Sequence, residues 1–123
     1  FDYALADVRD ANHSRAAAAF KRALAAGDGL LVHNYVLIEA VALLQRRLGH
    51  ETAVKFLTDA RMFHIHWVTE DDHAEAVRLF GERNKRGLSL VDCVSFTVMR
   101  GRDVNSALAF DQDFAAEGFS LYL

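Results

Sequence analysis

Apolar positions along the chain fall into segments of helix length and of strand length, in alternation. In residues 15–26 and 35–48, apolar side chains recur every three to four positions, which is typical of helices with one buried face. The run 30–33 between them is short and apolar, as buried strands are. The same criteria predict further helices at 51–60, 70–85 and 89–99, and further strands at 62–68, 107–110 and 119–122.

Polar residues at the segment boundaries support these limits. Four predicted helices have, at their start or just before it, a residue whose side chain can accept a hydrogen bond from the first backbone N–H groups. These residues are Asn12, Asn34, Thr69 and Ser89. Strands that alternate with helices in this way indicate an α/β fold with a mainly parallel sheet, covered on both faces. We expect residues 1–3 to be the remainder of an incomplete first strand.

The composition narrows the class of protein. The chain has 123 residues, of which 52% are hydrophobic and 25% charged, and this is enough for a single domain over 1–123 with a buried core. Its apolar runs are too short to cross a membrane, and its one cysteine excludes an internal disulfide, so we expect a cytoplasmic protein. The formal net charge of −3 disfavours nucleic-acid binding by electrostatics alone.

Single acidic residues interrupt three apolar segments. Glu39 is the only charged residue of YVLIEAVALL, and Asp92 is the only one of LSLVDCVSFTVM. Asp111 directly follows the apolar run ALAF, and Asp2 lies in the presumed first strand. Because the carboxyl ends of parallel strands share one edge of a sheet, we expect these four acids to meet at that edge.

A cluster of carboxylates that is removed from water requires a positive charge nearby. An isolated buried carboxylate costs several kcal/mol, and neighbouring carboxylates repel each other. No lysine or arginine lies inside the segments that carry these acids. Carboxylate oxygens are ligands that Mg²⁺ and Mn²⁺ prefer. The pattern therefore indicates a divalent metal site formed by Asp2, Glu39, Asp92 and Asp111.

Each acid also has a structural explanation, which stays open at this point. Asp92 stands three residues after Ser89, the spacing of a capping box at a helix start. Glu39 can face solvent or pair with a distant arginine. Asp111 or Asp113 can cap the short segment that follows them, and capping is the favoured role of Asp113.

Two other candidate sites have less support. His64 and His66 share one face of a predicted strand and could bind a transition metal, but no cysteine or carboxylate stands beside them at ligand spacing. Cys93 lies in an apolar helix, where packing is the expected role of a thiol.

The order and surroundings of the acids resemble those of PIN-domain nucleases, in particular the VapC-like toxins of bacterial and archaeal toxin–antitoxin systems. The resemblance runs through ALADVRDANHSRA, LVHNYVLIEAVALLQRRLG, VTEDDHAEAVRLF and GLSLVDCVSFTVMRGRDVNSALAFDQDF, which is nearly the whole chain. Its most specific parts are NYVLIEA with Glu39, GLSLVDCVSF with Asp92 and AFDQDF with Asp111.

This resemblance implies a three-layer α/β/α sandwich, cleavage of RNA with Mg²⁺ or Mn²⁺ as cofactor, a homodimer, and a cognate antitoxin protein that inhibits it. It implies that Glu39, Asp92 and Asp111 are catalytic residues and metal ligands. In the mechanism that we expect, Asn34 at the end of a strand hydrogen-bonds a ligand or orients a carboxylate. Family members carry a further acid, followed by Thr or Ser, at the end of the first strand. Here Tyr3 follows Asp2 directly, so Asp2 is that acid only if residues between the two are missing from this sequence.

Two other functions stay open. A phospho-accepting receiver domain is also a small doubly wound fold with acids that bind Mg²⁺, but it requires a lysine late in the chain, and none follows Lys85. The other is a PIN-like domain that has lost its activity and only binds a partner. Degradation of RNA that stops when a chelator is added separates the nuclease from both.

Overall fold

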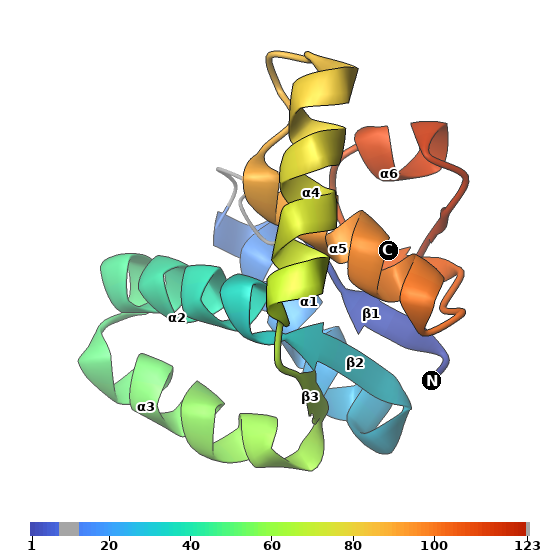
Figure 1. Cartoon of the computed structure of the whole chain (residues 1–123). Coiled ribbons are helices and arrows are strands. Elements are labelled where there is room, and N and C mark those ends of the chain that lie inside the picture. The colour runs from blue at the N-terminus through green and yellow to red at the C-terminus, as the bar shows by residue number, and fades with distance from the viewer. Residues whose placement is uncertain (8–12, 123) are drawn as a thin grey trace.

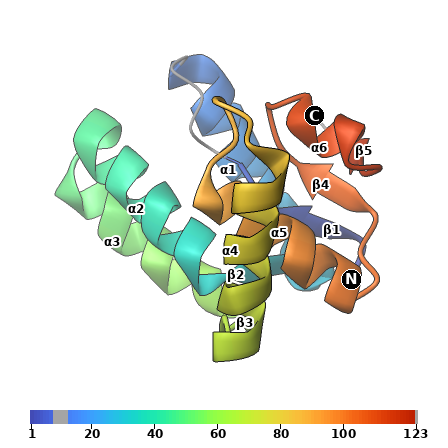
Figure 2. The same cartoon turned by 45° about the horizontal axis from the view of Figure 1, so that its top comes forward.

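The computed structural model describes residues 1–7 and 13–122, and in these residues a five-stranded parallel sheet lies between two layers of helices (Figure 1, Figure 2). The strands are β1 (Tyr3–Leu5), β2 (Leu30–His33), β3 (His64–His66), β4 (Ser106–Leu108) and β5 (Ser120–Leu121), in the spatial order β3-β2-β1-β4-β5. The helices are α1 (His13–Ala26), α2 (Asn34–Leu48), α3 (His50–Asp59), α4 (Glu70–Arg83), α5 (Leu90–Gly101) and α6 (Asp113–Ala116), with 3-10 turns η1 (Gly27–Gly29) and η2 (Ala60–Met62). The predicted α/β class and the parallel sheet are confirmed.

Alternate residues of the central strands face opposite helix layers. Leu5 and Val32 pack with α1, α2 and α3, whereas Ala4 and Leu31 pack with α4 and α5. This alternation follows from the two-residue period of a strand, and it requires both faces of the sheet to be apolar. The three layers are therefore α1–α2–α3, the sheet, and α4–α5, as the predicted α/β/α sandwich requires.

Aromatic rings pack α6 and the segment after it against α5. Phe96 of α5 is fully buried, and its ring centroid lies 4.8 Å from that of Phe114 and 5.8 Å from that of Phe119. Phe114 belongs to α6 and Phe119 precedes the edge strand β5. This cluster therefore attaches the C-terminal segment to the sheet.

Ion pairs join the same segment to α4 and α5 at the surface. Glu117 accepts hydrogen bonds from Arg83 Nε at 2.8 Å and from Arg100 Nη2 at 2.9 Å. The hydrogen bond from Arg83, followed by the one from Arg100, lowers the pKa of Glu117 to about 2 against the opposing effect of partial burial.

Two predicted helix starts are confirmed in detail. Thr69 caps α4 and Ser89 caps α5, each in a capping box whose returning side chain is Asp72 or Asp92, respectively. The predicted cap Asn12 lies outside the described residues.

The predicted cap of α2 is wrong. Asn34 does not cap this helix, because its Oδ1 accepts the backbone N–H of Val68 at 2.7 Å and so joins β2 to the segment after β3. His33 takes the capping position, where its Nδ1 accepts the backbone N–H of Val36 at 3.2 Å. Histidine is an uncommon cap, which is why the sequence pattern favoured the asparagine next to it.

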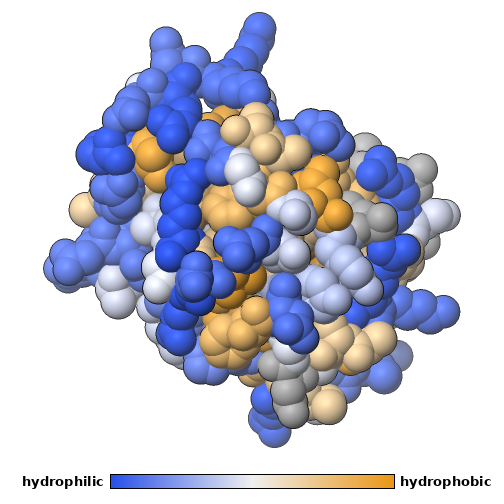
Figure 3. Space-filling model, turned by 90° about the vertical axis from the view of Figure 1, so that its right-hand side faces the viewer, coloured by the Kyte–Doolittle hydropathy of each residue, from blue (hydrophilic) through white to orange (hydrophobic). Residues whose placement is uncertain are grey.

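The surface mixes hydrophilic and hydrophobic side chains. On the face shown in Figure 3, hydrophobic areas are separated by hydrophilic ones. Scattered apolar surface of this kind is usual for a folded protein and does not by itself indicate a binding site. No helix within the described ranges 1–7 and 13–122 is long and apolar enough to cross a membrane.

We expect the substitution Phe96→Ala to lower the free energy of unfolding by about 3–5 kcal/mol, because it leaves a cavity between α5, α6 and the sheet. Urea denaturation followed by circular dichroism measures this. Phe80→Ala on α4 is the matched control: 46% of Phe80 is exposed, so its loss is expected to cost well under half as much. Equal losses in the two variants would contradict the packing role of Phe96.

Candidate active site

Parallel pairing brings the carboxyl ends of β1, β2 and β4 to one edge of the sheet. Leu5 of β1 lies opposite Val32 of β2 and Leu108 of β4. The pairing continues past the end of β1, because the backbone N–H groups of Ala6 and Asp7 donate to the carbonyl of Leu108 at 3.2 and 3.4 Å. The segments that follow β1 and β4 therefore leave the sheet side by side.

Asp7 is an acid at this edge that the sequence interpretation missed. It follows β1 by two residues and only 5% of it is exposed. The signal in the sequence was the run YALA followed by one acid, the same pattern that singled out Asp111 after ALAF. The expected strand over residues 1–3 ends before this run, whereas β1 extends from Tyr3 to Leu5.

Asp2 lies at the opposite edge, so the expectation that it meets the other acids is wrong. It precedes β1, and its backbone N–H donates to the carbonyl of Gly29 at 2.9 Å, at the amino end of β2. The Asp2 side chain lies over Gly29, where a Cβ atom on the glycine would approach Asp2 Oδ2 to 3.1 Å. The physical reason is the strand register. β1 begins at Tyr3, which pairs with Leu30, so Asp2 lies before the strand and not at its end.

Asp92 is held at the start of α5 and is fully buried. Its Oδ2 accepts the backbone N–H of Ser89 at 3.0 Å, and its own N–H donates to Ser89 Oγ at 3.0 Å. The capping explanation of Asp92 is therefore confirmed. Capping does not exclude metal binding, because an ionised carboxylate has two oxygens and about four lone-pair positions.

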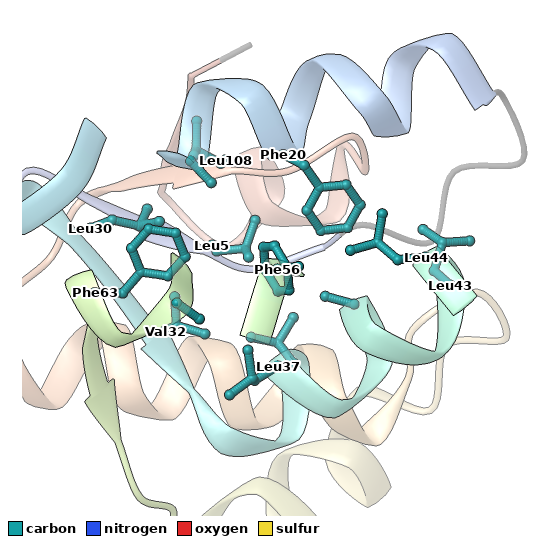
Figure 4. Close-up of a cluster of buried hydrophobic side chains, with 14 of the residues drawn as sticks. Leu5, Phe20, Leu30, Val32, Leu37, Leu43, Leu44, Phe56, Phe63 and Leu108 are labelled. Atoms are coloured by element: carbon teal, nitrogen blue, oxygen red, sulfur yellow. The ribbon is translucent and has the colours of Figure 1, made fainter. Parts of the chain in front are cut away.

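Glu39 lies on α2, which is packed firmly against the sheet. Figure 4 shows Leu37, Leu43 and Leu44 of this helix among the buried side chains of the layer formed by α1, α2 and α3. Glu39 itself is half-buried, and it lines a cavity of about 260 Å³ together with Arg46 and other residues of α2. The apolar side of α2 therefore fixes where Glu39 lies.

Asp111 follows β4, and it takes the local role that was expected of Asp113. The Asp111 Oδ1 accepts the backbone N–H of Asp113 at 2.9 Å. The Asp113 carboxylate instead forms an ion pair with Lys85, from the loop after α4. The expected capping role of Asp113 is thus wrong, because a lysine within reach binds its carboxylate.

A buried histidine lies next to this acidic edge. His33 ends β2, is 3% exposed, and its Nε2 lies 2.8 Å from Oγ of Ser95 on α5. Burial, and secondarily the charge of His66, lowers the pKa of His33 to about 3, so the ring is neutral near pH 7.

The remaining histidine and cysteine candidates have structural partners. His66 Nε2 lies 2.7 Å from Asp72 Oδ2, and Arg102 Nε donates to His66 Nδ1 at 3.1 Å. The ring of His64 lies against that of Phe1, with centroids 4.8 Å apart. Burial raises the pKa of the Cys93 thiol to about 11, which keeps it protonated and fits the expected packing role.

The edge supplies the donor atoms that a hard divalent cation prefers. Asp7, Asp92 and Asp111 offer carboxylate oxygens, and α2 adds Glu39. In the part of the chain that the structure describes, no three His, Cys, Asp or Glu side chains are grouped closely enough to hold a metal ion. Asp7, Asp92 and Asp111 thus offer the type of donor that such an ion prefers at one edge of the sheet, but the described side chains do not form a group of three ligands.

We expect the free energy of unfolding to fall by about 2 kcal/mol between pH 6.5 and pH 5, because unfolded His33 takes up a proton below 6.5 whereas the buried ring does not. The stability that comes from keeping His33 neutral in the folded protein is fully present above pH 6.5. It is lost as the pH falls from 6.5 toward about 3, the pKa of the buried ring. Urea denaturation across this range measures it. His33→Asn, which keeps a cap but has no titrating ring, should show a flatter profile, and an equal slope would contradict the assignment.

Comparison with known proteins assigns the fold to a family. The PIN domain family matches residues 3–119. The 23S rRNA-specific endonuclease VapC20 of Mycobacterium tuberculosis, in strain H37Rv and likewise in strain CDC 1551 / Oshkosh, is 38% identical over 122 residues, covering 94% of this chain and 88% of its own.

A solved structure agrees with this assignment. The crystal structure of M. tuberculosis VapC20, described as a toxin that cleaves the sarcin–ricin loop, superposes with a TM-score of 0.77 at 32% identity and covers 97% of this chain and 96% of its own. The receiver-type alternative is thereby ruled out, and the chain belongs to the PIN domain family, with VapC toxins among its relatives.

Proposed function

We propose that the protein is the endoribonuclease toxin of a toxin–antitoxin pair and that it hydrolyses a phosphodiester bond in the sarcin–ricin loop of 23S rRNA. The observation that carries this proposal is the 38% identity to VapC20 over 94% of the chain. The placement of Asp92 and Asp111 at the carboxyl edge of the sheet supports it, because this edge is where open α/β sheets bind ligands.

Glu39, Asp92 and Asp111 are the proposed metal ligands, and Asp7 replaces Asp2 as the fourth acid. The proposed ion is Mg²⁺ or Mn²⁺, and when bound it supplies activation of water and neutralisation of charge on the phosphoryl oxygens. The chain itself positions the carboxylates: the capping box orients Asp92, and the bond from the Asp113 N–H orients Asp111. Negative charge concentrated at this edge provides the attraction for the cation.

The proposal includes three further expectations. A cognate antitoxin protein binds and inhibits the enzyme, the toxin is a homodimer, and it acts in the cytoplasm, where the ribosome is found. They follow from the toxin assignment. A PIN-like domain without activity is the remaining alternative, and the cleavage assay below decides between the two.

We expect Asp92→Asn to lower the rate of cleavage of a sarcin–ricin loop RNA by roughly 100-fold or more, because it removes a negative ligand from the proposed metal site. The melting temperature should not fall, since asparagine keeps an oxygen for the capping box and removes a buried charge. Gel analysis of the labelled RNA measures the rate.

Asp2→Asn is the matched control, because it makes the same chemical change at the opposite edge of the sheet. It should cleave at the rate of the unmodified protein. Full activity of folded Asp92→Asn, or equal losses in both variants, would contradict the assignment of the site. Absence of cleavage by the unmodified protein would favour the inactive alternative.

Removal of divalent metal should abolish cleavage reversibly. Excess EDTA is expected to stop the reaction, and Mg²⁺ or Mn²⁺ added beyond the chelator should restore it. Ca²⁺ has a looser coordination geometry, so it should restore metal binding to the protein more fully than it restores the rate of RNA cleavage. Cleavage at full rate in EDTA would mean that the acids act without a metal ion.

A further inference from the structure

A chain of hydrogen bonds runs from β2 through α5 to the end of β1. The Nδ1 atom of His33 accepts the backbone N–H of Val36 at 3.2 Å, so in the neutral ring Nε2 carries the proton. That proton points at Ser95 Oγ, 2.8 Å away. Ser95 Oγ in turn donates to the carbonyl of Ala6 at 3.4 Å. His33 and Ser95 are 3% and 1% exposed, so water does not substitute for these bonds.

The three elements joined by this chain are those that carry acids. Val36 lies in the first turn of α2, which carries Glu39. Ser95 lies one helical turn after Asp92 on α5, and residues three apart share a face of a helix. Ala6 directly precedes Asp7. The imidazole of His33 and the hydroxyl of Ser95 thus connect the three segments that carry Glu39, Asp92 and Asp7.

Carboxylates that lie near one another repel, so the spacing between their elements has to be imposed by other groups. Apolar packing between α2 and α5 resists compression but does not fix rotation or sliding of one helix past the other. Directed hydrogen bonds between buried groups do fix it, because breaking one leaves a donor or acceptor without a partner.

We propose that His33 is a positioning residue of the active site: through Ser95 it fixes α2 and α5 relative to the end of β1, and so sets the spacing of the carboxylates that receive the metal ion. The inference rests on the proposed function, since it concerns the same acids. It goes beyond that function because His33 and Ser95, which are 3% and 1% exposed, are not among the proposed metal ligands.

Two substitutions test this role separately from folding. His33→Asn keeps an oxygen that can cap α2 but is too short to reach Ser95, and Ser95→Ala removes the hydroxyl between the ring and Ala6. Thr97→Ala is the matched control on α5: it removes a hydroxyl that donates to the carbonyl of Cys93 at 2.9 Å, a bond within the helix.

Isothermal titration with Mn²⁺ in the absence of RNA is the main measurement, and melting temperatures are recorded in parallel. We expect His33→Asn and Ser95→Ala each to weaken Mn²⁺ binding by roughly 10- to 100-fold, the usual effect of groups that orient metal ligands, and Thr97→Ala to leave it unchanged. The double variant should weaken binding no more than either single one, since both break one chain of bonds.

The outcomes separate the inference from the function on which it rests. Unaltered Mn²⁺ binding in both folded variants overturns the positioning role while leaving the nuclease assignment intact. Failure of the unmodified protein to bind Mn²⁺ overturns both the metal site and the inference. If His33→Asn does not fold, Ser95→Ala decides alone, because it leaves the cap of α2 in place. Additive losses in the double variant would overturn the inference, because His33 would then not act through Ser95.

Discussion

Parallel pairing of β1 with β2 and β4 is the constraint on which the candidate active site depends. In a parallel sheet the carboxyl ends of all strands lie at the same edge. The residues after β1 and β4 therefore lie at this edge together with the start of the helix after β2, however long the chain between them is. The strands are only three or four residues long, which leaves little room for the site to lie elsewhere along them. Asp2 precedes β1, so it lies at the opposite edge of the sheet, one strand length away from the other acids.

Acids at this edge are stabilised differently from those at the periphery. Asp92 and Asp111 accept backbone N–H groups, whereas Asp113 and Glu117 bind the basic side chains of Lys85, Arg83 and Arg100. A backbone N–H orients a carboxylate but cancels less of its charge than a guanidinium or ammonium group does. The backbone bonds at this edge therefore orient Asp92 and Asp111.

Much of the architecture could be predicted from the sequence, because apolar periodicity and caps act locally. The cap at Thr69 and the capping box of Ser89 could be predicted from spacing alone, and both are present in the structure. The errors concern residues whose partners are distant in the chain. Asn34 contacts Val68 and Asp113 contacts Lys85, and no local pattern contains either partner.

The candidate site was predictable to the same extent. The rule of one acid in or after an apolar run selects Asp92 and Asp111, and applied to YALA it also selects Asp7, which lies at the same edge of the sheet. It failed for Asp2 because strand register is decided by pairing with β2 and β4 rather than by the residues of β1. The link from His33 to Ser95 spans 62 positions and could not be read from either segment.

The two outer strands of the sheet bear on how the molecule behaves at high concentration. β3 has three residues and β5 has two, so each outer strand presents only a few backbone groups to which another chain could add as a further strand. Short outer strands are one means by which folded proteins avoid stacking into fibrils. This brevity limits strand addition at both outer edges of the sheet without requiring charged or proline residues there.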